Sequence, residues 1–193
     1  MHISSRSVLV VGLLALCPAI AVRAEDAKTA PANHASAKAA PAAMPAKASS
    51  GDVSWLKDAD TAGNAEVAAA TLAVGKAQRA DVKAFAQKMV DEHAAANKEL
   101  GAIATKMGVA LPATKPAEHG LDTKSGADFD VAYLKLQVTA HEKAEKLFEN
   151  AAKADDADIR TFAAKTLPAI REHLVEVRKL AGIPAPVPAP AVK

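Results

Sequence analysis

Four long stretches of the chain repeat apolar residues at intervals of three and four, and this periodicity constrains the possible folds more than any other feature of the sequence. Such spacing gives an α-helix one apolar face, whereas strands alternate apolar and polar residues, which no stretch here does. The sequence therefore predicts an all-α fold built from four amphipathic helices. We expect them over residues 53–77, 82–107, 129–154 and 157–181.

The lengths of the connections predict how these helices are arranged. Short turns near residues 78–81 and 155–158 join the first helix to the second and the third to the fourth. A loop of about 20 residues, rich in Pro and Gly, joins the two hairpins. Short connections make neighbouring helices antiparallel, so we expect an antiparallel four-helix bundle over residues 52–182.

Local signals mark the expected ends of these helices. Asp or Ser residues at the start of the first three helices are predicted N-caps, because their side chains accept hydrogen bonds from free backbone N–H groups. Pro168 lies inside the fourth stretch, where it should kink or break the helix. The predicted N-caps are Asp52 or Ser54, Asp81 and Asp128.

The segments outside the bundle differ from it in composition. Residues 1–24 have the pattern of a secretory signal peptide, with Arg6 before an apolar run that is shorter than the roughly 20 residues of a membrane span. Residues 25–51 are rich in Ala, Pro and Lys, and residues 183–193 are rich in Pro. We expect these two segments to be a disordered linker and a disordered tail.

The signal peptide predicts a location outside the cytoplasm of a bacterium. Cleavage near Ala24 would release a periplasmic or secreted protein without a transmembrane span. Cys17 follows Leu16 rather than a small residue, so we do not expect a lipid anchor. The linker and tail would then tether the bundle to an envelope protein or to the cell wall.

Charge and cysteine content exclude several classes of protein. With 24 basic and 22 acidic residues, the chain lacks the positive excess of a nucleic-acid-binding protein. A single Cys excludes a disulfide framework and a Cys-based zinc finger. The sequence contains no Ser-His-Asp order, Gly-rich phosphate loop or CxxC pair, and this favours a protein that is not an enzyme.

Four polar residues interrupt the apolar faces, one on each predicted helix. Glu66 and His93 lie at equal distances from the middle of the first turn, and His141 and His173 lie at equal distances from the middle of the second. Each pair should therefore face across its own hairpin. If both turns lie at the same end of the bundle, the pairs differ in depth by about 4 Å, so all four residues can meet in the core.

One carboxylate among imidazoles suits a bound transition metal ion. Three neutral His side chains and one Glu carboxylate are suitable ligands for a Zn, Cu, Fe or Mn ion. Two alternatives remain open: the four groups form only a polar network that fixes helix packing, or they do not converge. Residues about one turn away are candidates to support the ligands, namely Asn97, Gln137 and Glu145.

Longer motifs surround these polar residues. Glu66 lies in Asn-Ala-Glu-Val, and His93 lies in Asp-Glu-His-Ala-Ala-Ala-Asn, within a segment from Val82 to Leu100. The later helices carry Phe-Asp-Val-Ala-Tyr-Leu, Ala-His-Glu and Thr-Leu-Pro-Ala-Ile-Arg-Glu-His-Leu. Taken together over residues 53–182, these motifs resemble the bacterial exported family called domain of unknown function 4142.

This resemblance implies a ferritin-like four-helix fold and the description "predicted outer membrane protein" that such proteins carry. Ferritin-like di-iron sites use Glu-x-x-His motifs, but Val90 and Ile170 stand three residues before His93 and His173. The residues therefore argue against di-iron chemistry. They favour an exported bundle that binds one metal ion for metal homeostasis or envelope stress. A structural or interaction module of the envelope is the alternative, and a metal-dependent oxidase is a third possibility.

Overall fold

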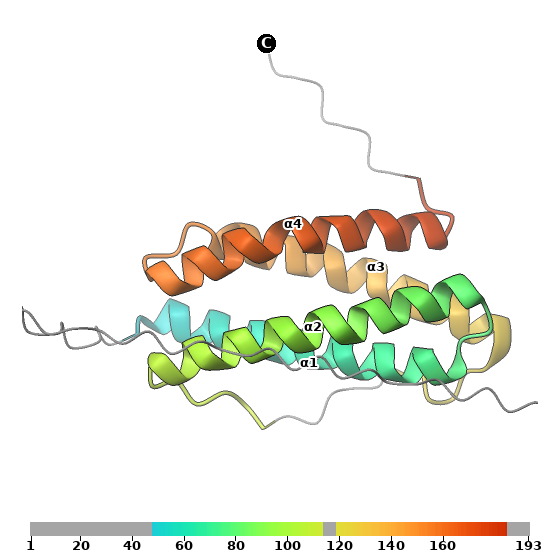
Figure 1. Cartoon of the computed structure of the whole chain (residues 1–193), viewed down its shortest axis with the longest axis horizontal. Coiled ribbons are helices and arrows are strands. Elements are labelled where there is room, and N and C mark those ends of the chain that lie inside the picture. Colours follow the sequence, from blue (N-terminus) through green and yellow to red (C-terminus); the bar gives the residue numbers. More distant parts are fainter. Residues whose placement is uncertain (1–47, 114–118, 185–193) are drawn as a thin grey trace, which may run out of the picture. The chain divides into compact units, whose positions relative to one another are not determined.

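A computed structural model describes residues 48–113 and 119–184, and within them the chain forms four α-helices. Figure 1 shows that α1 and α2 form one antiparallel hairpin and that α3 and α4 form the other. α3 starts at the end of the bundle where α2 starts, so these two helices run in the same direction. The predicted four-helix bundle is confirmed. The helices are α1 (Ser50–Lys76), α2 (Ala80–Lys106), α3 (Gly126–Ala151) and α4 (Ala157–Leu180).

The first helix begins earlier than the sequence pattern indicated. Ser49 is its N-cap, and the Ser49 hydroxyl accepts a hydrogen bond from the backbone N–H of Asp52 at 3.0 Å. The Asp52 carboxylate in turn accepts from the backbone N–H of Ser49, which completes a capping box. The prediction of Asp52 or Ser54 as the N-cap was therefore wrong, because Asp52 is the third helical residue that closes the box.

The start of the second helix is capped by a residue from another helix. Arg79 is its N-cap but makes no capping hydrogen bond with its own side chain. The buried Asp130 of α3 accepts hydrogen bonds from the backbone N–H groups of Gln78 and Arg79, both at 2.9 Å. The predicted N-cap, Asp81, lies instead in the first turn of α2 and pairs with the Arg79 guanidinium at 2.7 Å.

Two further local predictions concern the start of α3 and the effect of Pro168. α3 is preceded by Ser125 as its N-cap, so the predicted cap Asp128 was wrong and lies within the first turn. A kink or a break was expected at Pro168, and the break does not occur, because α4 continues through this residue. Pro168 is exposed. Proline has no backbone N–H, so the carbonyl four residues earlier in α4 loses its helical hydrogen-bond donor. This carbonyl lies on a face of the helix that water can reach.

Buried apolar side chains form two separate clusters, one toward each end of the bundle. Fully buried side chains such as Phe85 and Leu56 contribute about 1.5–3 kcal/mol each. The first apolar cluster comprises Ala69, Ala70, Ala73, Ala77, Val82, Phe85, Ala86, Met89, Leu121, Phe129, Tyr133, Leu134, Val138, Leu174 and Val177. The second apolar cluster comprises Trp55, Leu56, Ala59, Leu100, Ala104, Ala151, Ile159, Phe162 and Ala163.

A layer of polar side chains, one from each helix, lies between these two clusters: Glu66, His93, His141 and His173. The two turns lie at opposite ends of the bundle, as Figure 1 shows. The residues nevertheless share one level, because each lies near the middle of a helix of 24 to 27 residues. We call these four residues the polar layer.

Some sequence-based expectations concern residues outside the described part of the chain. They include the signal peptide with its cleavage site at Ala24, Cys17, most of the linker and most of the Pro-rich tail. These expectations stay predictions. Within residues 48–113 and 119–184, no helix is both long enough and apolar enough to span a membrane.

Candidate metal centre

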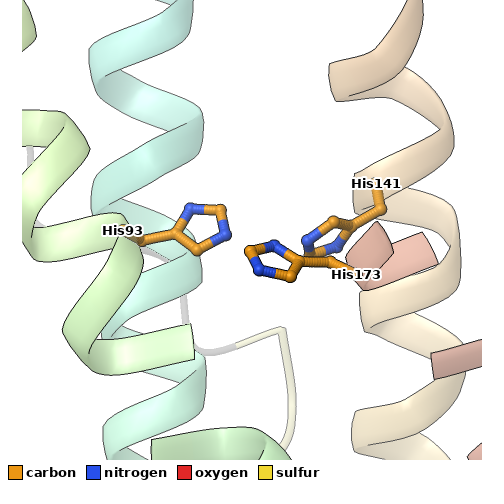
Figure 2. Close-up of side chains that lie close together, drawn as sticks. All are labelled: His93, His141 and His173. Atoms are coloured by element: carbon orange, nitrogen blue, oxygen red, sulfur yellow. The ribbon is translucent and has the colours of Figure 1, made fainter. Parts of the chain in front are cut away.

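Three of the four residues of the polar layer come together in the core. His93 of α2, His141 of α3 and His173 of α4 each offer one ring nitrogen, and these nitrogens lie within 4.8 Å of one another. The ring centroids are 5.4–5.6 Å apart. In Figure 2 the three imidazoles extend from their helices toward a common point. The spacing is suitable for one ion held by three imidazoles.

A backbone carbonyl fixes the orientation and the protonation of His141. Its Nδ1 lies 3.0 Å from the carbonyl oxygen of Gln137, one helical turn earlier. A carbonyl can only accept, so Nδ1 carries the proton and donates it. The other nitrogen, Nε2, is left with a lone pair, and it is buried with no hydrogen-bond partner among the described residues. His141 is therefore held in the form in which Nε2 can bind a metal.

The carboxylate of Glu92 fixes the orientation and the protonation of His173. Its Nε2 donates a hydrogen bond to Oε2 of Glu92 at 2.7 Å, and its Nδ1 is buried without a partner in the described structure. Sequence reasoning missed Glu92 because it lies on the exposed side of α2. Its position directly before His93 was the available signal. Neighbouring helical residues are rotated by about 100°, so one can face the core while the other faces an adjacent helix.

His93 completes the group from the opposite hairpin. Its Nε2 is also buried and has no hydrogen-bond partner in the part of the chain that the structure describes. Three unpaired nitrogens thus share one apolar site, and an unsatisfied buried polar group costs about 1–3 kcal/mol. A cation accepting all three lone pairs would remove this cost in one step.

The site keeps its imidazoles neutral. Burial lowers the pKa of His93 to about 3, with a smaller contribution from repulsion by His141 and His173. Burial lowers the pKa of His141 to about 4 and outweighs the hydrogen bond to the Gln137 carbonyl. Burial also lowers the pKa of His173, against the opposing influence of Glu92. Neutral imidazole is the form that binds metal ions, so little proton release would accompany binding near pH 7.

Glu66 lies beside this group rather than within it. Its Oε1 is 3.8 Å from Nδ1 of His141, which is the nitrogen bound to the Gln137 carbonyl. Its Oε2 is buried without a partner among the described residues. Burial raises the pKa of Glu66 to about 7. The side-chain amide of Gln137 lies close enough to oppose this shift, but it makes no hydrogen bond of normal geometry to Glu66.

The three predicted supporting residues have different surroundings. Gln137 supports His141, through its backbone carbonyl rather than its side chain. Asn97 donates a hydrogen bond to Oδ1 of Asn64 at 3.3 Å, which links α2 to α1. Glu145 pairs with the Arg171 guanidinium at 2.8 Å on the surface of the bundle. Neither of these two interactions joins Asn97 or Glu145 to Glu66 or to the three His.

A cavity of about 530 Å³ adjoins the polar layer and is lined by residues of all four helices. Glu66, His93 and His173 contribute to its wall, and Gln137 does so next to them. Most of the remaining wall is apolar and extends toward the second apolar cluster. Any ion at the three His would therefore have free space on one side.

The arrangement can be compared with known proteins. The family model described as Domain of unknown function (DUF4142) matches residues 37–180. The chain belongs to this family. The DUF4142 match includes all four helices and every residue of the polar layer.

One solved structure resembles the DUF4142 bundle, a crystal structure of a DUF305 fragment from Deinococcus radiodurans. The TM-score is 0.62 at 14% sequence identity, and the match covers 71% of this chain and 99% of that chain. At this identity the likeness shows the fold alone. Comparison with curated proteins gives no match.

Proposed function

We propose that this DUF4142 protein binds one divalent transition metal ion through Nε2 of His93, Nε2 of His141 and Nδ1 of His173. The supporting observation is that these are the three buried ring nitrogens without hydrogen-bond partners in the described structure. The opposite nitrogens of two of the rings are engaged by Glu92 and by the Gln137 carbonyl. Metal-binding His residues characteristically donate their second N–H to a carboxylate or carbonyl in this way.

The ligand set favours particular metals. Three neutral imidazoles suit Zn²⁺ or Cu²⁺ better than Mn²⁺, which prefers oxygen ligands. Glu66 would lie outside the three ligands and supply negative charge near the cation. Three protein ligands leave a fourth position for water or another small ligand, on the side where the cavity offers space.

The predicted signal peptide would bring this site to the periplasm. There, a single preformed site without thiols would suit reversible binding of zinc or copper, in metal buffering or in protection of the envelope from metal stress. Structural metal sites usually have four protein ligands, so three ligands with an open position fit a reversible site better than a permanent one.

The test is a calorimetric titration of the metal-free protein with Zn²⁺. We expect saturation at one ion per chain, and loss of binding in His141→Ala. His34→Ala is the matched control, because His34 precedes α1 in the sequence and is not one of the three His of the group. Circular dichroism checks that each variant keeps its helices. No saturable binding, or equal binding by His141→Ala and the parent protein, would refute the proposal.

A structural role is the second candidate, because two of the three His already have hydrogen-bond partners on the protein. In that case the polar layer only fixes the register of the helices between the two apolar clusters. Replacement of His93 by Leu discriminates between the two roles. A structural role predicts that added Zn²⁺ leaves the urea midpoint of both the parent protein and His93→Leu unchanged, whereas metal binding predicts that Zn²⁺ raises the midpoint of the parent and not that of the folded variant.

A further inference from the structure

The cavity beside the polar layer has features that the three His do not explain. It is formed because small side chains line it on every helix, among them Ala62, Ala96, Ala144 and Ala169. Protein interiors are normally packed to a density that leaves few voids larger than a water molecule. At about 530 Å³ the cavity lies within the range of small-molecule sites.

Buried polar groups at one end of the cavity lack partners. Gln137 is fully buried, and neither its Oε1 nor its Nε2 has a hydrogen-bond partner among the residues that the structure describes. Glu66, also in the cavity wall, is 7% exposed and its Oε2 is equally unpartnered. Native proteins rarely leave such groups unsatisfied, so each one needs a physical explanation. The Gln137 amide offers a donor and an acceptor side by side.

The other end of the cavity is apolar and accessible. Leu100, Phe148 and Phe162 line it where it meets the second apolar cluster. Its wall includes two exposed residues, Lys143 of α3 and Lys165 of α4, and Lys165 pairs across the surface with Glu99 of α2. A molecule can therefore reach the cavity from the surface of the bundle.

We propose that this cavity binds a small amphipathic molecule, with a neutral hydroxyl head held by Gln137 and Glu66 and an apolar body against the alanines. A hydroxyl can donate to Gln137 Oε1 or Glu66 Oε2 and accept from Gln137 Nε2, which satisfies the unpartnered atoms. A charged head would lose much more hydration on entering this apolar site than a hydroxyl does. The inference does not depend on metal binding, since it uses the cavity and its polar end alone.

The direct experiment titrates the metal-free full-length protein with para-pentylphenol. Trp55 is the only Trp of the chain and packs edge-on against two cavity-lining rings, with centroids 5.5 Å from Phe148 and 6.3 Å from Phe162. Its fluorescence reports on occupancy, and calorimetry gives the stoichiometry. We expect saturable binding of one molecule per chain. The absence of saturable binding would overturn the proposal.

Two cavity-filling variants test where the probe binds. Ala144→Phe and Ala169→Leu should each abolish binding of the probe or weaken it at least tenfold. If one of these two variants does not fold, the other still tests the site. Ala164→Phe is the control, because Ala164 is exposed on α4 and absent from the cavity wall. Binding that persists in both folded filling variants would overturn the cavity as the site.

Substitution of Gln137 tests the proposed head group. Gln137→Leu keeps the backbone carbonyl that holds His141 and removes only the side-chain amide. It should weaken para-pentylphenol about fivefold to tenfold and leave pentylbenzene binding unchanged. In the parent protein, para-pentylbenzoate and para-pentylbenzylamine should bind more weakly than the phenol. Tighter binding of either charged probe, or no effect of Gln137→Leu on the phenol, would overturn the assignment of a neutral hydroxyl head.

Discussion

Replacement of Glu66 by Gln should stabilise the metal-free protein at alkaline pH. Glu66 is buried, and its pKa is raised from 4.5 to about 7 because burial penalises the ionised form. Above pH 7 the folded protein must therefore carry a buried carboxylate that the unfolded chain would expose to water. A pKa difference of about 2.5 units, from 4.5 to about 7, corresponds to about 3 kcal/mol. Glutamine has the same shape and never ionises.

The effect has a defined pH window. Below pH 4.5 the carboxyl group is protonated in both the folded and the unfolded chain, so Glu66→Gln should change the unfolding free energy little. Between pH 4.5 and 7, Glu66 is protonated in a larger fraction of the folded molecules than of the unfolded ones. The contribution of Glu66 to stability therefore falls as the pH rises. The advantage of the variant should grow through this window and level off near 3 kcal/mol above pH 7.

Urea denaturation between pH 4 and pH 9, in the presence of a chelator, measures this difference. Glu99→Gln is the matched control, since Glu99 is exposed and pairs with Lys165 on the surface. We expect the control to change stability by less than about 0.5 kcal/mol at every pH. A Glu66→Gln variant that is less stable than the parent at pH 8, or whose advantage does not change with pH, would show that burial of the Glu66 carboxylate does not destabilise the folded protein.

Substitutions at three further positions test other parts of the structure. Glu92→Ala should weaken zinc binding roughly 10- to 100-fold because His173 loses the group that orients it, and Glu92→Gln should restore part of the affinity in the same titration. Asp130→Ala should destabilise the bundle by about 1–3 kcal/mol in urea denaturation, because two backbone N–H groups lose their acceptor. An unchanged urea midpoint in Asp130→Ala would show that these two hydrogen bonds do not stabilise the bundle. Pro168→Ala should stabilise the exposed middle of α4 by about 1–3 kcal/mol, and a loss of stability would show that the proline ring contributes packing.

Much of the fold was predictable because it follows from periodicity and connection length. The spacing of apolar residues gave the four helices, and the short turns gave the antiparallel hairpins. Helix starts were less predictable, since several candidate caps lie close together in sequence and the choice between them depends on tertiary contacts. Asp130 illustrates this, because it caps a turn some 50 residues away in the chain, and only folding places it there.

The candidate site was predictable in part for a related reason. Polar residues on apolar helical faces stand out in the sequence, and this pattern identified His93, His141 and His173. Their mutual approach required the three-dimensional structure. Glu92 was missed because a Glu on the exposed side of a helix looks like an ordinary surface residue. The cavity was not predicted either, because alanine at many positions indicates close helix packing as readily as empty space.

X-ray absorption at the zinc edge can show whether the three imidazoles hold one metal ion. Protein loaded with zinc and freed of excess metal should contain one zinc per chain. Its spectrum should show three imidazole nitrogens at about 2.0–2.1 Å and a light ligand in the fourth position. Zinc bound by one imidazole, or a spectrum unchanged by His93→Ala, would contradict a shared site in the core of the bundle.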